Sequence, residues 1–207
     1  MAQVLRDKGG FWSPVISRIE HDGKPAVLKD YRPKNAVTRS LLAPTLVKRE
    51  FDVLRHLDGV VGIPRAYAVL DGLALVTEFI DGQHPGRFEK LPDEVFRRLA
   101  ATVRAMHDRD VVHLDLRQKK NIVIDGEMRP WLIDFANAII LRRGSPLRPL
   151  AAKLRDLDVG ALTKFKARYW PHLLTDVDRD AMKRQRFLRR LWPFSPHTDR
   201  PKDKTWT

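Results

Sequence analysis

The chain has 207 residues, of which 43% are hydrophobic, and its formal net charge is +13. This composition supports a buried core and excludes a disordered chain, and the length fits one domain or two lobes that share a cleft. The absence of cysteine excludes disulfides, thiolate zinc sites and a cysteine nucleophile, and it favours a reducing compartment.

Targeting signals and charge distribution narrow the location and the partners. No apolar run approaches the roughly 20 residues that a membrane-spanning helix needs, and the N-terminal MAQVLRDKGG lacks the apolar core of a secretion signal. We therefore expect a cytoplasmic protein. The basic excess is concentrated in residues 142–207, which is either an ordinary solvated face or a surface that attracts polyanions such as nucleic acid, anionic lipid or phosphorylated glycans.

The first third of the chain is predicted to be rich in β-strands. Short apolar runs bounded by turn formers predict strands at 15–20, 25–31, 66–72 and 73–79. Between them, the stretch LVKREFDVLRHL (46–57) has apolar residues at helical spacing, with Pro44 just before it, and predicts a helix that ends near Gly59. The turn formers of residues 81–86, with no apolar anchor among them, give the strongest linker signal in the chain.

After this linker the hydrophobic period becomes helical. Residues 92–110 place five apolar side chains on one face, namely Val95, Phe96, Leu99, Val103 and Met106. Strands are predicted at 122–124 and 131–133, and further helices at about 149–170 and 176–192.

The expected fold class is therefore α+β. We predict a small β-rich N-lobe at residues 1–80 and a shortened helical C-lobe at residues 81–207, in which residues 193–207 form a flexible tail. A cleft between two lobes is where ligands usually bind.

A polar cluster follows the first C-lobe helix, in VVHLDLRQKKNIVID (111–125). The predicted hairpin would place Asn121 and Asp134 at adjacent strand ends, where an amide oxygen and a carboxylate make a hard-oxygen site suited to Mg²⁺. Asp115 lies upstream in the same loop and is free to act on a substrate hydroxyl.

These residues resemble the catalytic elements of the protein-kinase-like superfamily. HLDLRQKKN is similar to its catalytic loop and DFA to its metal-binding triplet, and the spacing of 13 between Asn121 and Asp134 is the most specific match. The resemblance, which runs from about residue 8 to 140, implies a two-lobe kinase that uses ATP and Mg²⁺. It also implies that Asp115 is the catalytic residue and that Asn121 and Asp134 bind the metal.

The resemblance extends to a lysine and a carboxylate upstream. Lys29 in AVLKDY matches the strand lysine that grips the α- and β-phosphates, and Glu50 in VKREFDVL matches the helix carboxylate that pairs with it. A single strand lysine is more often a surface residue, and a single helix glutamate is more often solvated. The order and spacing of all the elements together favour the kinase-like interpretation.

Two further nucleotide contacts are implied by the resemblance. Residues 77–80 are similar to the hinge strand, so the backbone of Glu78 and Ile80 would bind adenine. Gly9 and Gly10 in KGGFWS are the candidates for the loop that covers the phosphates, although this loop is poorer in glycine than in the family.

The sequence departs from the family pattern in two other places. The loop from Asp115 to Asn121 is one residue longer than usual, which leaves open the roles of the basic residues Arg117, Lys119 and Lys120; one of them is expected to reach the transferring phosphate or an anionic acceptor. Ala136 replaces the glycine after Asp134-Phe135, and alanine restricts φ at that position.

Three functions fit these observations. With 73 residues after Asp134 and no A-P-E segment, the chain is similar to trimmed bacterial kinases, namely lipopolysaccharide core-sugar kinases, including the kinase of the acidic sugar Kdo, and RIO-like atypical kinases. The first hypothesis is an ATP-dependent kinase of a lipopolysaccharide-type sugar hydroxyl, with an anionic glycolipid or sugar as acceptor. The second is a RIO-like protein serine/threonine kinase, and the third is a nucleotide-binding scaffold without turnover, against which the retention of the whole set of site residues argues.

The basic C-terminal segment leaves its own alternatives open. Residues 174–194 alternate cationic and apolar side chains, which suits either peripheral contact with an anionic membrane or an ordinary helix packed on the C-lobe. Few aromatic residues are interleaved with the basic ones, so a nucleic-acid surface is only weakly supported.

Overall fold

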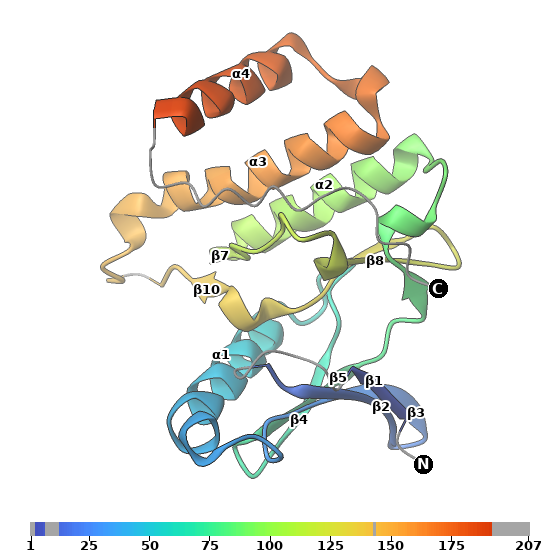
Figure 1. The fold of residues 1–207 in the computed structure, drawn as a ribbon, viewed down its shortest axis with the longest axis vertical. Coiled ribbons are helices and arrows are strands. Elements are labelled where there is room, and N and C mark those ends of the chain that lie inside the picture. Colours follow the sequence, from blue (N-terminus) through green and yellow to red (C-terminus); the bar gives the residue numbers. More distant parts are fainter. Residues whose placement is uncertain (1–2, 7–12, 143, 192–207) are drawn as a thin grey trace.

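The computed structural model describes residues 3–6, 13–142 and 144–191, with side chains described up to residue 183 in the last helix. It confirms the predicted α+β class: Figure 1 shows a β-rich part, in blue and cyan, below a helical part, in green to red. The predictions for Gly9, Gly10 and the tail from residue 193 lie outside the described residues.

The β-rich part is one antiparallel sheet with the strand order β1-β2-β3-β5-β4. Its strands are β1 (Gln3–Arg6), β2 (Val15–His21), β3 (Lys24–Asp30), β4 (Ala66–Leu70) and β5 (Ala74–Glu78). Both predicted hairpins are confirmed. The turn between β2 and β3 has Asp22 and Gly23 at φ 50° and 72°, as a tight two-residue hairpin requires. Strand β1 was not predicted, because its four residues carry no turn signal or clear alternation.

One helix covers this sheet. Helix α1 (Ala43–His56) begins a few residues before the predicted start, so Pro44, expected just before the helix, lies in its first turn, and a π-helical turn over Thr38–Leu42 precedes it. It packs against β4 and β5 with an apolar face that includes Val47, Val53 and Leu54. Glu50 also lies on this buried face and is only 5% exposed, so α1 carries a carboxylate into the interior.

The segment predicted to be a linker is partly ordered in a second sheet. Gly82–Gln83 forms strand β6, which pairs with β8 (Ile122–Asp125), and Pro85 is buried. The prediction of a segment without an apolar anchor is therefore wrong. The physical reason is close packing: a Cβ at position 82 would contact the carbonyl of Ile124, so only glycine fits there.

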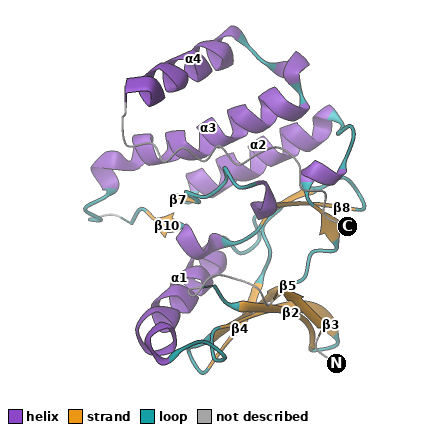
Figure 2. Cartoon of the chain, viewed as in Figure 1, coloured by secondary structure: helices purple, strands orange, loops and turns teal. Residues whose placement is uncertain are grey.

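The helical part stacks three helices in the order α2, α3, α4 (Figure 2). They are α2 (Asp93–Asp108), α3 (Ala151–Tyr169) and α4 (Asp176–Leu191), close to the predicted spans. The remaining strands are β7 (Val111–Val112), β9 (Pro130–Leu132) and β10 (Ile139–Ile140), of which β9 completes the predicted hairpin with β8. None of the helices described is long and apolar enough to cross a membrane.

Helix α4 is attached to α3 by an ion pair. The Nζ of Lys166 on α3 lies 2.7 Å from Oδ2 of Asp178 on α4. Of the two alternatives for this segment, the contact with α3 is the one that the described residues show.

The loop between α1 and β4 ties the β-rich part to the helical part. The backbone N–H of Leu132 donates to the carbonyl of Gly62 at 2.8 Å, and Oγ1 of Thr102 donates to the carbonyl of Val61 at 3.1 Å. Gly62 has a φ of 84°, and a Cβ there would lie 2.7 Å from Oγ1 of Thr102. This junction therefore requires glycine both for its backbone conformation and for space.

Candidate active site

Three charged side chains from three distant segments meet between the two parts of the molecule. Lys29 points from β3, Glu50 from α1, and Asp134 follows β9. The Nζ of Lys29 lies 2.6 Å from Oε1 of Glu50 and 3.0 Å from Oδ1 of Asp134. The structure thus brings together three of the residues singled out in the sequence.

The charges of this cluster hold one another ionised. Burial alone would lower the pKa of Lys29, but the carboxylates of Glu50 and Asp134 outweigh it, so the pKa of Lys29 lies above its ordinary value. Burial likewise opposes ionisation of Asp134, and the Lys29 ammonium overcomes this and lowers the pKa of Asp134. A fixed ammonium beside a fixed carboxylate can bind a phosphate and a metal cation side by side.

The loop after β7 brings Asp115 and Asn121 to the same place. The Nδ2 of Asn121 donates to the carbonyl oxygen of Asp115 at 2.9 Å and to its Oδ2 at 3.0 Å. The N–H of Ile133 donates to the carbonyl of Asn121 at 2.9 Å, so Asn121 lies across from the residue that precedes Asp134. The β8–β9 register, which pairs Ile122 with Leu132, fixes this placement.

The oxygens of Asn121 and Asp134 fit a divalent cation. The Oδ1 of Asn121 is buried and accepts no hydrogen bond from any described residue, and a buried acceptor without a donor is costly unless something satisfies it. Asp134 has a φ of 66°, and its side chain remains 36% exposed and open to a ligand. Two oxygen ligands from the protein suit Mg²⁺, which takes its other ligands from phosphates and water. The described residues hold no cluster of three or more His, Cys, Asp or Glu side chains that could bind a metal by themselves.

Asp115 is partly exposed and has a partner that the sequence did not indicate. Gln118 directs its Nε2 at both carboxylate oxygens of Asp115, at 2.7 and 2.6 Å. The carboxylate is therefore oriented by two amides, those of Gln118 and Asn121.

A buried carboxylate on α3 anchors the start of the loop that carries Asp115 and Asn121. Asp158 is 1% exposed and accepts the backbone N–H of His113 at 2.8 Å and that of Leu114 at 3.0 Å. It also accepts Nε2 of His107 at 3.1 Å. Asp158 was missed in the sequence, yet it occupies an apolar position of α3, where the buried neighbours are Ala161, Leu162 and Phe165. A charged residue on an apolar helical face was the available signal.

His113 supports the loop as a neutral side chain. Its Nε2 donates to the carbonyl of Ile133 at 3.2 Å, its Nδ1 accepts the N–H of Asp115 at 3.4 Å, and its ring packs on Phe135. Burial lowers the pKa of His113. Both ring nitrogens hold backbone groups, so this histidine orients Asp115 rather than acting as a base.

The segment after Asp134 is tied to α1. The N–H of Phe135 donates to Oε1 of Glu50 at 3.1 Å, and the carbonyl of Ala136 accepts Nη2 of Arg49. Ala136 lies in a 3-10 turn and is not among the residues with positive φ, so alanine in place of glycine fits this conformation.

The candidate adenine contacts lie at the end of β5. The N–H of Glu78 donates to the carbonyl of Arg65 at 2.8 Å, and its carboxylate accepts the N–H of Arg65 at 3.1 Å, so these groups are engaged within the protein. Ile80 lies between β5 and β6, and within the described chain its backbone has no backbone partner. The backbone N–H of Glu78 is thus already bonded within the protein, whereas the backbone of Ile80 is not bonded to another backbone group of the described chain.

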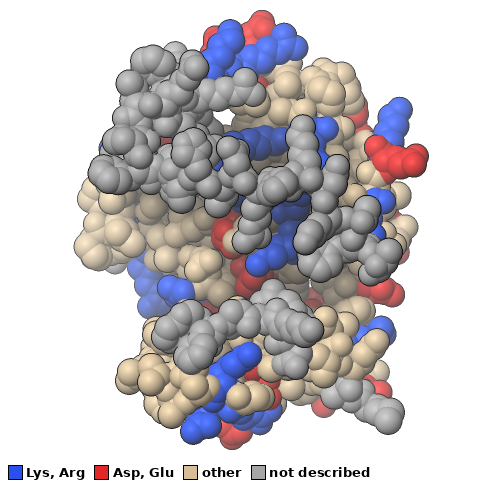
Figure 3. Space-filling model, in the orientation of Figure 1, with Lys and Arg blue, Asp and Glu red and all other residues tan. Residues whose placement is uncertain are grey.

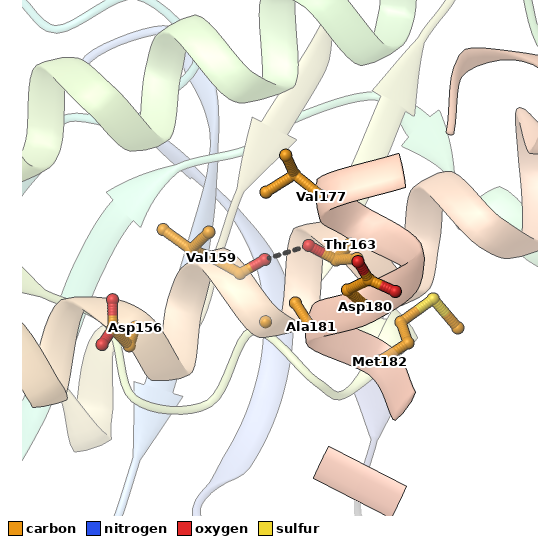
Figure 4. Close-up of a pocket in the computed structure, with 8 residues that line it drawn as sticks. Asp156, Val159, Thr163, Val177, Asp180, Ala181 and Met182 are labelled. Carbon is orange, nitrogen blue, oxygen red and sulfur yellow. Dashed lines mark hydrogen bonds between the residues drawn. The ribbon is translucent and has the colours of Figure 1, made fainter. Parts of the chain in front are cut away.

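Another cavity lies between α3 and α4, away from these residues, with a volume of about 480 Å³. Figure 4 shows it lined by Val159, Thr163, Val177 and Met182, with Oγ1 of Thr163 donating to the carbonyl of Val159. Its charged lining residues are Asp156 and Asp180. Two carboxylates repel a triphosphate, so this cavity is not a nucleotide site.

Comparison with known proteins gives the family. Residues 4–198 match the model of the phosphotransferase enzyme family (APH), well beyond residue 140, where the resemblance in the sequence ended. Among curated proteins the chain is 32% identical over 99 residues to a 3-deoxy-D-manno-octulosonic acid kinase of Vibrio cholerae, a region that covers 42% of each protein. It is 49% identical over 45 residues to the kinase of the same name from Photobacterium profundum, or 22% of this chain and 19% of that one.

Two other similar proteins are also kinases. A PAS domain-containing serine/threonine-protein kinase of Mus musculus is 39% identical over 66 residues, which cover 32% of this chain and 5% of that protein. The Rio2 kinase from Chaetomium thermophilum, solved as an ADP/Mg²⁺-phosphoaspartate complex, has the same fold, with a TM-score of 0.61 and 20% identity over 87% of this chain and 61% of that one. The matched regions thus span less than half of the length of these curated relatives. The match over residues 4–198 shows that the chain belongs to the phosphotransferase enzyme family, with a kinase-like fold.

Proposed function

We propose that this protein transfers the γ-phosphoryl group of ATP to a hydroxyl group of an acidic sugar of the lipopolysaccharide type. The observation that carries the proposal is the meeting of Lys29, Glu50 and Asp134 beside the Asp115–Asn121 loop. In this proposal residues 1–80 and 81–207 are the two lobes, and the nucleotide binds between them, in the cytoplasm, where ATP is available.

The charged residues would bind the triphosphate. Lys29, oriented by Glu50, supplies a fixed positive charge for the α- and β-phosphates. Asn121 and Asp134 would hold Mg²⁺, which neutralises charge on the phosphate oxygens. The charge of Lys120, in the neighbouring loop, contributes to lowering the pKa of Asp134. Lys120 would therefore add positive charge near the phosphates.

Asp115 would act on the acceptor. Its carboxylate orients the acceptor hydroxyl, the oxygen of which forms a bond to the γ-phosphorus while the bond from that phosphorus to the ADP oxygen breaks. The hydroxyl proton passes to Asp115 and then to solvent. Gln118 donates to both oxygens of Asp115, and because a carboxylate oxygen accepts up to two hydrogen bonds, Oδ1 can still accept the acceptor hydroxyl.

The choice of acceptor rests on the relatives. Two of the curated proteins that match are named as kinases of 3-deoxy-D-manno-octulosonic acid, from two bacteria. We extend this substrate class, an acidic sugar, to the present chain. The names of these relatives mention neither a membrane lipid nor a nucleic acid as a partner.

A protein acceptor is the second candidate. Its specific support is the matching segment of a mouse serine/threonine-protein kinase. Against it, the described chain between Asp134 and α3 contains only short elements, β10 and two 3-10 turns, which offer little surface for an extended peptide.

The test is a labelling assay with purified protein, γ-labelled ATP and Mg²⁺. We expect label in a deacylated core oligosaccharide that carries 3-deoxy-D-manno-octulosonic acid, and none with Asp115→Asn. Lys153→Ala, an exposed change on α3, is the matched control and should keep full activity. Label in a protein mixture but not in the sugar would support the second candidate. Absence of label in both, with nucleotide still bound, would indicate a scaffold without turnover.

A further inference from the structure

A basic cavity lies beside the catalytic loop, on the side of α3. We call it the cationic pocket; its volume is about 360 Å³ and its lining residues are Arg117, Lys119, Lys164, Phe165, Ala167 and Arg168. Two of these residues come from the loop between Asp115 and Asn121, and the other four come from the C-terminal half of α3.

Neighbouring residues of the loop between Asp115 and Asn121 face two different sites. Gln118 donates to Asp115, so it faces the phosphoryl-transfer site. Arg117 and Lys119 line the cationic pocket instead. Residues of one short loop therefore form both the reacting site and the wall of the pocket next to it.

The lining of the cationic pocket is rich in positive charge. Within the described chain, Arg117, Lys119 and Arg168 form no ion pair with an acidic residue, whereas Lys166 and Arg155 on the same helix pair with Asp178 and Asp110. Figure 3 shows Lys and Arg side chains gathered near the middle of the face, where the helical and β-rich parts meet. Like charges held together without a partner favour an anionic ligand.

The short chain segment between Arg117 and Asp115 limits how far the pocket can lie from Asp115. Arg117 is two residues from Asp115, so their Cα atoms are at most about 7 Å apart. A lining residue of the pocket is thus a near neighbour of Asp115 in the chain, which makes the pocket a candidate site for the anionic group of a small acceptor whose hydroxyl reacts at Asp115.

We propose that the cationic pocket binds the carboxylate of the acceptor sugar and so places the reacting hydroxyl at Asp115. This inference rests on the proposed function and assigns the acceptor subsite within it. Ala167 and Phe165 supply the apolar part of the lining, and the charge comes from the loop, which includes Lys119, and from α3, which includes Arg168.

The test uses binding and kinetics in parallel. Free 3-deoxy-D-manno-octulosonic acid is titrated by calorimetry into protein saturated with ADP and Mg²⁺, for the wild type and for Lys119→Ala and Arg168→Ala. We expect each variant to bind the acid about tenfold more weakly, because each loses a charge-assisted hydrogen bond. The methyl ester of the sugar lacks the charge; it should bind the wild type weakly and lose little more in the variants. In the labelling assay the same variants should raise the KM for the sugar about tenfold, with the KM for ATP as internal reference.

Lys153→Ala is the matched control for Arg168→Ala. Both residues are exposed cations on α3, but they are separated by about 22 Å along the helix, and Lys153 does not line the pocket. Wild-type affinity in Lys153→Ala together with losses in both pocket variants supports the inference.

The outcomes separate this inference from the proposed function. If the sugar is phosphorylated but Lys119→Ala and Arg168→Ala keep the wild-type Kd and KM, the pocket is not the acceptor subsite and the function stands. If the acid binds through the pocket but is not phosphorylated, the subsite stands and the function falls. If the wild type neither binds nor phosphorylates the acid, or binds the ester as well as the acid, the inference is overturned.

Discussion

The Nζ of Lys29 lies 2.6 Å from Oε1 of Glu50, although the two residues stand 21 positions apart on a strand and a helix. The same glutamate oxygen accepts the N–H of Phe135 at 3.1 Å. One carboxylate oxygen therefore joins β3, α1 and the segment after β9. Its loss should affect both stability and chemistry.

Lys29→Met should abolish turnover and destabilise the fold. The change leaves the buried Glu50 without its cation, and breaking one partner of a buried ion pair costs about 3–5 kcal/mol. Urea unfolding measures this loss. Lys48→Met is the matched control, because Lys48 pairs with Asp52 at the same 2.6 Å but on the exposed side of α1, where a pair contributes about 0–1 kcal/mol. Equal losses in both variants would contradict this account, and adding Glu50→Gln to Lys29→Met should recover part of the stability.

Asp115→Asn should lower kcat about 10²–10⁴-fold, because the amide cannot accept the hydroxyl proton. The side chain is partly exposed and bonded to Gln118, so the free energy of unfolding and the affinity for ADP should hardly change. Steady-state kinetics and a nucleotide titration measure the two effects. Retention of more than about a tenth of wild-type kcat would rule out Asp115 as the proton acceptor.

Asp158→Asn should destabilise the protein by about 3 kcal/mol or more, because two backbone N–H groups of the catalytic loop lose an ionised acceptor. It should lower kcat as well, since the loop carries Asp115. Asp156→Asn, two residues away and exposed, is the control and should stay within about 0.5 kcal/mol of the wild type. Similar unfolding midpoints for the two variants would show that Asp158 does not anchor the loop.

Gly62→Ala should cost more stability than Gly59→Ala. Both glycines have a φ near 80°, which disfavours alanine by about 1–2 kcal/mol. A Cβ at position 59 meets nothing within 4 Å, whereas at position 62 it would lie 2.7 Å from Oγ1 of Thr102 and 2.9 Å from the carbonyl of Pro130. Overpacking of this kind adds about 1–3 kcal/mol. Thermal unfolding of the two variants gives the difference directly, and equal midpoints would contradict the close contact.

Stability should fall as the pH drops below about 6.5 because of His113. Burial lowers the pKa of His113 below its ordinary value of 6.5, so the unfolded chain takes up the proton at a higher pH than the folded protein does. The stability that neutral His113 contributes is fully present above pH 6.5. It is lost as the pH falls towards the pKa of His113 in the folded protein, with a slope of at most about 1.4 kcal/mol per pH unit. Urea unfolding at pH 7 and pH 5 measures it. His113→Gln should show a smaller drop than the wild type, and an equal drop would assign the pH dependence to other groups.

The order of elements could be predicted from the sequence because each depends on a local pattern. Alternation and turn formers identified β2 to β5, and helical spacing identified α1 and α2. The Asp-Gly turn at residues 22–23 needs positive φ at both positions, and this local requirement made the hairpin predictable.

The features that could not be predicted from the sequence depend on tertiary contacts. The pairing of Gly82–Gln83 with β8 joins segments about 40 residues apart and leaves no local pattern. Gln118 and Asp158 act on residues brought near by the fold, and the place of Lys119 in the lining of the cationic pocket depends on how α3 packs beside the loop. The resemblance to kinases identified the site residues, which are Lys29, Glu50, Asp115, Asn121 and Asp134. Only the coordinates show how these residues meet.

The β-rich part and the helical part are joined at several places besides the chain crossing at Ile80–Asp81. The loop at Gly62 is bonded to Leu132, and α1 is bonded to the segment after Asp134 through Arg49 and Glu50. A change in the separation of Lys29 and Asp134 therefore has to disturb bonds that α1 makes with that segment. The positions of these two charges are preorganised by the fold.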